Sequence, residues 1–139
     1  MIEITNTTNY RVPRQFILKT LKHSISYLQI KNPVLSVVFV MPATIKKLNL
    51  NYRHKNKITD VLSFSYQYDK NNLEGEIIIC YSVAVQQAKE FKYSTRQEIS
   101  RLLIHSLLHL IKYDHDIAHQ AKKMEALEND IIKYLRKKI

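Results

Sequence analysis

The chain of 139 residues has little of what many small proteins use for covalent stability, secretion or membrane attachment. Cys80 is the only cysteine, so no intramolecular disulfide can form, and we expect a reducing, cytoplasmic setting. No stretch approaches the roughly 20 apolar residues that span a bilayer. The first ten residues lack the basic stretch and apolar core of a signal peptide. We therefore expect neither a membrane span nor a secretory leader.

Repeats, low-complexity tracts and interdomain linkers are also missing, which predicts a single domain over residues 1–139. A chain of this length buries about two-thirds of its unfolded surface, so a hydrophobic core can stabilise it without disulfides. Glycine occurs only at Gly75, near the start of a predicted strand. A glycine in that position suggests a β-bulge or a close backbone approach.

Basic residues are abundant and unevenly distributed. The net charge is +10, from 22 basic and 12 acidic residues. Residues 1–60 hold ten basic and two acidic side chains, a net +8, whereas residues 61–139 hold twelve and ten, a net +2. Such a field attracts polyanions. A merely solubilising, lysine-rich surface would give the same composition, so the charge indicates a polyanionic partner only beside a functional site.

The pattern of apolar residues predicts an α+β domain. Alternating apolar residues and β-branched runs predict four strands, at residues 2–5, 34–40, 58–64 and 74–80. Ile77, Ile78 and Ile79 in the last of these indicate burial on both faces, and residues 67–72 are expected to form a polar loop. Apolar residues at helical spacing predict about five helices between and after the strands. The order of elements predicts a mixed sheet of about four strands packed with these helices.

Helix boundaries follow from proline and capping residues. The helices are expected to begin near Pro13, Pro42, Ser82, Ser94 and Ile117. Ser82 is expected to cap the third helix. Ser94 with Gln97, and Thr95 with Glu98, form two overlapping capping-box patterns before the fourth helix.

The fourth helix carries the most informative residues. Residues 102–111 are apolar around nearly the whole helix, which predicts a central buried helix. His105 and His109 are four residues apart and therefore lie on one helical face. His115 follows six residues later and can approach them if the helix ends near Ile111 and the chain turns back. Three imidazoles with an open fourth position describe a catalytic zinc site. The alternative is buried histidines hydrogen-bonded to backbone, the commoner role of a single histidine.

The spacing His-x3-His-x5-His is similar to that of the metzincin proteases, H-E-x-x-H-x-x-G-x-x-H. Ser106 stands where that motif has its general-base glutamate. Another metal hydrolase, for example a peptidase, is therefore an alternative that the sequence disfavours.

Longer motifs resemble the YbeY-type endoribonuclease family. Residues 105–115, H-S-L-L-H-L-I-K-Y-D-H, are similar to the family's H-G-x-L-H-L-x-G-Y-D-H. Residues 48–64 are similar to L-N-x-x-Y-R-x-K-D-K-x-T-D-V-L-S-F, residues 74–82 to L-G-D-I-x-I-S/C, and residues 124–128 to M-E-x-x-E. Two family glycines fall on Ser106 and Lys112. We expect Ser106 to preserve helix packing, and Lys112 to adopt a positive φ at a cost of about 1 kcal/mol.

The resemblance implies a single-strand-specific, metal-dependent endoribonuclease of ribosomal RNA maturation (16S rRNA processing) and ribosome quality control. Its partners would be single-stranded RNA, rRNA and the small ribosomal subunit. Its metal ligands would be His105, His109 and His115, holding one zinc ion (Zn2+) that activates water. Arg53 would bind or stabilise phosphate. Arg53 and His109 are thus the candidate catalytic residues. A non-catalytic RNA- or ribosome-binding module with a structural metal is the remaining alternative.

Other residues near Arg53 have two interpretations. Asp60 and Ser63 are candidates for lining the cleft, although Asp60 could merely cap a turn. Tyr52, Phe64 and Tyr66 could stack on unpaired bases, although such aromatic residues more often belong to a core.

Overall fold

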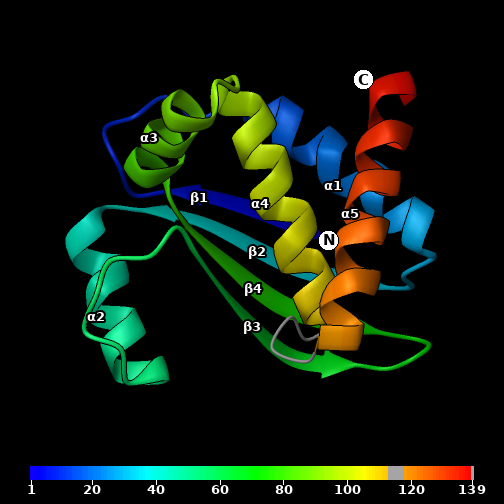
Figure 1. The fold of residues 1–139 in the computed structure, drawn as a ribbon. Helices are drawn as coiled ribbons and strands as arrows, with labels where there is room; N and C mark the ends of the chain where they lie inside the picture. Colours follow the sequence, from blue (N-terminus) through cyan, green and yellow to red (C-terminus); the bar gives the residue numbers. More distant parts are fainter. Residues whose placement is uncertain (113–117, 139) are drawn as a thin grey trace.

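A computed structural model describes residues 1–112 and 118–138. Its four strands are β1 (Ile2–Asn6), β2 (Pro33–Val40), β3 (Val61–Tyr68) and β4 (Leu73–Cys80). The helices in these ranges are α1 (Arg14–Leu28), α2 (Pro42–Arg53), α3 (Tyr81–Phe91), α4 (Thr95–Leu110) and α5 (Ala118–Lys138). The order β-α-β-α-β-β-α-α-α confirms the predicted α+β class (Figure 1).

The sheet has the strand order β1-β2-β4-β3. β1, β2 and β4 are parallel, and β3 is antiparallel to β4, so the sheet is mixed as predicted. β4 lies inside the sheet and is buried on both faces. Ile77 and Ile79 pack into one hydrophobic cluster and Ile78 and Cys80 into another, which confirms the prediction from the isoleucine run.

Helices cover the two faces of the sheet unequally. α1, α3 and α4 contribute to the larger cluster, in which Leu21 and Leu103 pack with Val37 and Ile77. α2 contributes Ile45 to the smaller cluster on the opposite face. α5 packs against α4 through the residues Ile104, Leu108, Met124, Ile131 and Leu135. α4 is therefore enclosed, as its apolar circumference predicts. Within residues 1–112 and 118–138, no helix combines the length and apolar character needed to cross a membrane.

Gly75 has both roles that its position suggested. The register of β3 shifts between Ser65, which pairs with Gly75, and Gln67, which pairs with Glu74, so a bulge lies opposite the glycine. A Cβ atom at Gly75 would also lie only 2.8 Å from Cδ2 of Leu110 in α4 and 3.1 Å from the Phe64 carbonyl oxygen. The glycine therefore allows α4 to pack directly on the sheet.

The boundaries predicted for β3 were wrong at both ends. The strand spans Val61–Tyr68 instead of residues 58–64. Before it, the Val61 N–H donates to the Asp60 carboxylate at 2.8 Å, which holds the preceding residues in a loop. At the other end, the bulge allows pairing to continue to Tyr68, so the loop predicted at 67–72 begins only at residue 69. Polar residues are tolerated there because β3 is an edge strand.

Of the predicted caps, one is confirmed. The Gln97 N–H donates to Ser94 Oγ at 3.1 Å, and the Ser94 N–H donates to the Gln97 side chain at 2.8 Å, which forms a capping box. The overlapping pattern of Thr95 with Glu98 does not form a capping box, because Thr95 is the first residue inside α4. The Ser82 prediction was also wrong: α3 begins at Tyr81, after Cys80, and no side chain caps it.

Several helices end on left-handed residues that are not glycine. The φ angles are 55° at Gln29, 58° at His54 and 60° at Lys92, the caps of the first three helices. Lys112, just beyond α4, has φ 76°, which confirms the predicted positive angle. Side chains with a Cβ atom adopt this region at a cost of about 1–2 kcal/mol.

We predict that Lys112→Gly raises the free energy of unfolding by roughly 0.5–1 kcal/mol, because relief of backbone strain exceeds the added entropy of the unfolded chain. Urea denaturation followed by circular dichroism measures this free energy of unfolding. The matched control is Lys46→Gly, at an exposed position inside α2, which should lower the same free energy by about 1 kcal/mol. Equal losses in both variants would contradict the strain at Lys112.

Candidate active site

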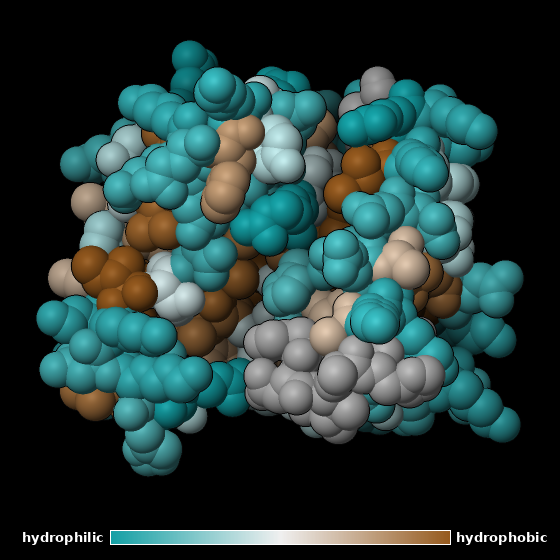
Figure 2. All heavy atoms as spheres, viewed as in Figure 1, coloured by the Kyte–Doolittle hydropathy of each residue, from teal (hydrophilic) through white to brown (hydrophobic). Residues whose placement is uncertain are grey.

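A cavity of about 650 Å³ lies between the end of α2, β3 and α4. Figure 2 shows this face, where hydrophobic side chains are visible between α2 and α4 and hydrophilic ones surround them. The described residues that line the cavity are Asn49, Arg53, Lys55, Lys57, Thr59, Asp60, Val61, Leu62, Ser63, Ser65, Arg101, Leu102, His105, His109 and Leu110. The segments are far apart in sequence, so the fold creates this site.

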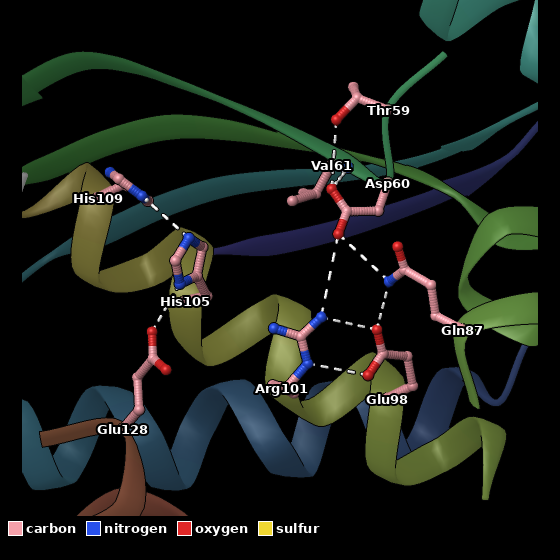
Figure 3. A network of polar contacts seen from close by, with 9 residues as sticks. All are labelled: Thr59, Asp60, Val61, Gln87, Glu98, Arg101, His105, His109 and Glu128. Atoms are coloured by element: carbon pink, nitrogen blue, oxygen red, sulfur yellow. Dashed lines mark hydrogen bonds and ion pairs between the residues drawn. The ribbon is translucent and has the colours of Figure 1, made fainter. Parts of the chain in front are cut away.

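The two histidines of α4 converge in this cavity. Their ring centroids are 4.6 Å apart, and the two Nε2 atoms lie 3.1 Å from each other (Figure 3). Two nitrogens that each lie about 2.0–2.1 Å from a tetrahedral zinc ion are separated by about 3.3 Å. The distance between His105 and His109 is therefore compatible with two ligands of one metal ion, and their role as ligands stays a prediction.

The third predicted ligand, His115, lies outside the described residues. Within the described ranges, no group of three or more His, Cys, Asp or Glu side chains is arranged to hold a metal ion. The structure thus brings two of the three predicted ligands together, and the place of His115 beside them stays a prediction.

Glu128 of α5 orients His105. Its Oε1 atom lies 2.6 Å from Nδ1 of His105, and both side chains are largely shielded from solvent. A carboxylate at this distance accepts the Nδ1–H hydrogen bond and thereby selects the tautomer whose Nε2 lone pair faces the cavity. Zinc-binding histidines commonly have such a carboxylate on the other ring nitrogen.

The sequence interpretation missed this role of Glu128. The available signal was its position on the stripe of α5 that faces α4, between Met124 and Ile131, where a charged residue is unusual. Only the packing of α5 on α4 pairs it with a particular histidine.

Arg53 lies at the end of α2 and lines the same cavity as His105 and His109. Its Nη2 atom donates to the Ser63 carbonyl oxygen at 2.7 Å, and its guanidinium lies 5.0 Å from the centre of the Phe64 ring. Both contacts come from β3. The strand therefore holds an otherwise exposed arginine beside the cavity.

Asp60 and Ser63 line the cavity, as expected. Tyr52 and Tyr66 are 62% and 64% exposed, so a core role is wrong for these two tyrosines. Tyr52 packs edge-on against Phe64, with ring centroids 5.5 Å apart. Exposed aromatic rings beside a basic cavity are suited to stacking on unpaired bases.

The cavity is electropositive. Its described lining includes four cationic side chains, Arg53, Lys55, Lys57 and Arg101, against the single carboxylate of Asp60, a net +3 with neutral histidines. Three of these cations, Arg53, Lys55 and Lys57, belong to the basic first part of the chain, residues 1–60. Part of its excess positive charge therefore lies at this cavity. Such a lining concentrates polyanions.

The sequence interpretation also did not identify Arg101 as a residue of the cavity. Its Nε and Nη2 atoms donate to the two oxygens of Glu98, at 2.9 and 2.8 Å, and Glu98 is fully buried. Gln87 donates to Glu98 as well, and Asp60 lies 4.0 Å from Arg101 Nη2 (Figure 3). The hydrogen bonds to Glu98 raise the pKa of the Arg101 guanidinium, against the lowering effect of burial. The capping-box interpretation of Glu98 concealed this pair.

Ser106, which follows the first histidine, is fully buried. It therefore belongs to the core, where a small residue is needed, and does not line the cavity. A glutamate base of the peptidase type has no counterpart at this position.

Comparisons with known proteins agree with the motifs. A family model described as Endoribonuclease YbeY matches residues 3–136. The chain is 39% identical over 128 residues to the Endoribonuclease YbeY of Thermodesulfovibrio yellowstonii, covering 87% of this chain and 80% of that protein. It is 34% identical over 133 residues to that of Persephonella marina, covering 90% and 85%.

A solved structure shares the fold. The solution structure of a Thermotoga maritima protein matches with a TM-score of 0.64 and 23% sequence identity, covering 99% of this chain and 93% of that one.

We predict that Glu128→Gln lowers the affinity for zinc roughly 10- to 100-fold, because the amide no longer accepts the Nδ1–H bond as a charged partner. Competition between the protein and a chromophoric chelator measures the affinity. Glu125→Gln is the matched control, since Glu125 is exposed on the same helix. Equal affinities for the Glu128 and Glu125 variants would contradict the orienting role.

Proposed function

The chain belongs to the YbeY endoribonuclease family, and from this premise we propose that it cleaves single-stranded RNA in the maturation and quality control of ribosomal RNA. The substrate would be the 16S rRNA of the small ribosomal subunit, in the cytoplasm, a setting that suits the free thiol of Cys80. The observation that supports it is the convergence of His105 and His109 in a cavity that Arg53 also lines.

The proposed cofactor is one zinc ion held by His105, His109 and His115. When bound, it supplies Lewis acidity, which acidifies water to a pKa of about 7 and withdraws electron density from a phosphoryl oxygen. Glu128 keeps the His105 ring in the tautomer that a metal requires. Imidazole ligands suit zinc, although nickel and copper also bind them.

Arg53 binds the phosphate that is cleaved. Its guanidinium is always charged, and its planar fork matches two phosphate oxygens. The contacts to Ser63 and Phe64 hold this group in place before substrate arrives, so little reorganisation is needed as negative charge builds up on the phosphate.

The surroundings favour a single strand. Lys55 and Lys57 attract the backbone without regard to sequence. Tyr52 and Tyr66 present exposed rings on which splayed bases can stack, which paired bases in a duplex cannot do.

We predict that His109→Ala and Arg53→Ala each reduce cleavage of a labelled single-stranded RNA by at least about 100-fold, by loss of the metal and of charge stabilisation respectively. A chelator should abolish wild-type cleavage, and added zinc should restore it. Rates are measured by gel electrophoresis, with folding checked by circular dichroism. Arg11→Ala is the control for Arg53, because Arg11 follows β1 at the opposite edge of the sheet.

The same assay separates the alternatives. Full cleavage by either variant would refute the assigned role of that residue. RNA binding without cleavage, unaffected by the chelator, would indicate a binding module instead. Chelator-sensitive cleavage of casein with intact RNA would indicate a peptidase, which the buried Ser106 disfavours.

A further inference from the structure

We propose that Arg101 is a second phosphate-binding residue of the cavity and holds the backbone phosphate next to the one that is cleaved, so that the RNA strand runs along α4. This inference rests on the proposed function, because it assigns the direction in which the same cavity receives its substrate.

The exposure pattern of α4 sets Arg101 apart. From residue 101 to residue 110, only Arg101, His105 and His109 are not buried. They are four residues apart, so they form one row along the helix, with about 6 Å of axial rise between neighbours. All three line the cavity. Arg101 therefore extends the row of the two histidines by one cationic side chain, toward the N-terminus of α4.

The contacts of Arg101 leave one edge of its guanidinium for a ligand. Glu98 engages Nε and Nη2, and Asp60 lies on the Nη2 side. No acceptor among the described residues contacts Nη1, and Figure 3 shows this nitrogen pointing away from Glu98, toward the side on which His105 lies. Nη1 carries two N–H donors. The side chain is 36% exposed and lines the cavity, and it also borders a second hollow on the side of Phe16 and Arg96.

The buried carboxylate gives the arginine a defined position. Glu98 is fully buried and receives hydrogen bonds from both Arg101 and Gln87. A two-point contact to a rigid partner removes most of the freedom that an arginine otherwise loses on binding an anion. Arg101, Glu98 and Asp60 together carry one net negative charge, so the group acts through its directed donors and the positive field comes from Arg53, Lys55 and Lys57.

A double variant tests this role without changing the net charge. Glu98→Gln with Arg101→Met removes one charge of each sign, and the buried amide can keep its hydrogen bond with Gln87. Binding is measured by fluorescence anisotropy with a labelled 2′-O-methyl RNA of mixed sequence, over a series of salt concentrations. We expect roughly 5- to 10-fold weaker binding at low salt. We also expect the slope of log K against log [salt] to stay close to that of the wild type, because the double variant keeps the net charge of this group and the positive field of Arg53, Lys55 and Lys57.

Arg96→Met is the control on the same helix. The Arg96 guanidinium lies 5.2 Å from the centre of the Phe16 ring, and Arg96 does not line the cavity. This variant lowers the net charge by one, yet its RNA affinity should stay close to that of the wild type. An affinity that falls as much for Arg96→Met as for the double variant would overturn the assignment.

The outcomes distinguish this inference from the proposed function. Wild-type protein that neither binds nor cleaves single-stranded RNA would refute the proposed function. Wild-type binding with an unchanged affinity in the double variant would refute only the role of Arg101. If the double variant fails to unfold cooperatively in urea, Arg101→Lys decides: it keeps the charge but loses the fork, and unchanged RNA affinity would overturn the proposal.

Discussion

The enclosure of α4 is the constraint on which the rest of the structure depends. Between Arg101 and Leu110 the helix buries every residue except three, and it packs on the sheet, on α1 and α3, and beneath α5. A helix packed on so many sides cannot rotate about its axis without exposing leucines or burying imidazoles. The burial of large apolar side chains, each worth about 1.5–3 kcal/mol, therefore also sets the direction of the histidines.

Polar contacts also help to fix the position of α4 and of its exposed side chains. The Ser65 hydroxyl of β3 donates to the Leu110 carbonyl oxygen at 3.1 Å, where α4 ends, and Gly75 leaves room for the Leu110 side chain. Glu128 reaches His105 from α5, and Glu98 anchors Arg101 one turn earlier. His105 and Arg101 on α4 are thus each held by a carboxylate that does not line the cavity. For the proposed metal ligands, such support would fix the ligand geometry before a metal ion binds.

The predictions that agree best with the structure are those that depend on residues only a few positions apart in the sequence. The capping box of Ser94 and Gln97 formed because its residues are three positions apart, and Lys112 took a positive φ because the helix must end there. β3 began later and ended later than its apolar run, since the Asp60 side chain and a bulge decided its limits. Ser82 lost its expected cap because α3 starts directly from the end of β4.

By itself, the amino-acid sequence determined the α+β class, the order of elements, and the facing pair His105 and His109, because hydrophobic periodicity and the helical repeat act over a few residues. The family motifs add Arg53 without saying what holds it. Only the tertiary structure decided that β3 supports Arg53, that Glu128 pairs with His105, and that Glu98 is buried beneath Arg101. The first two contacts join groups on different elements, and their separation depends on how those elements pack. Glu98 and Arg101 are three residues apart on one helix, so the helical repeat brings them together, but the burial of Glu98 depends on which face of α4 is enclosed.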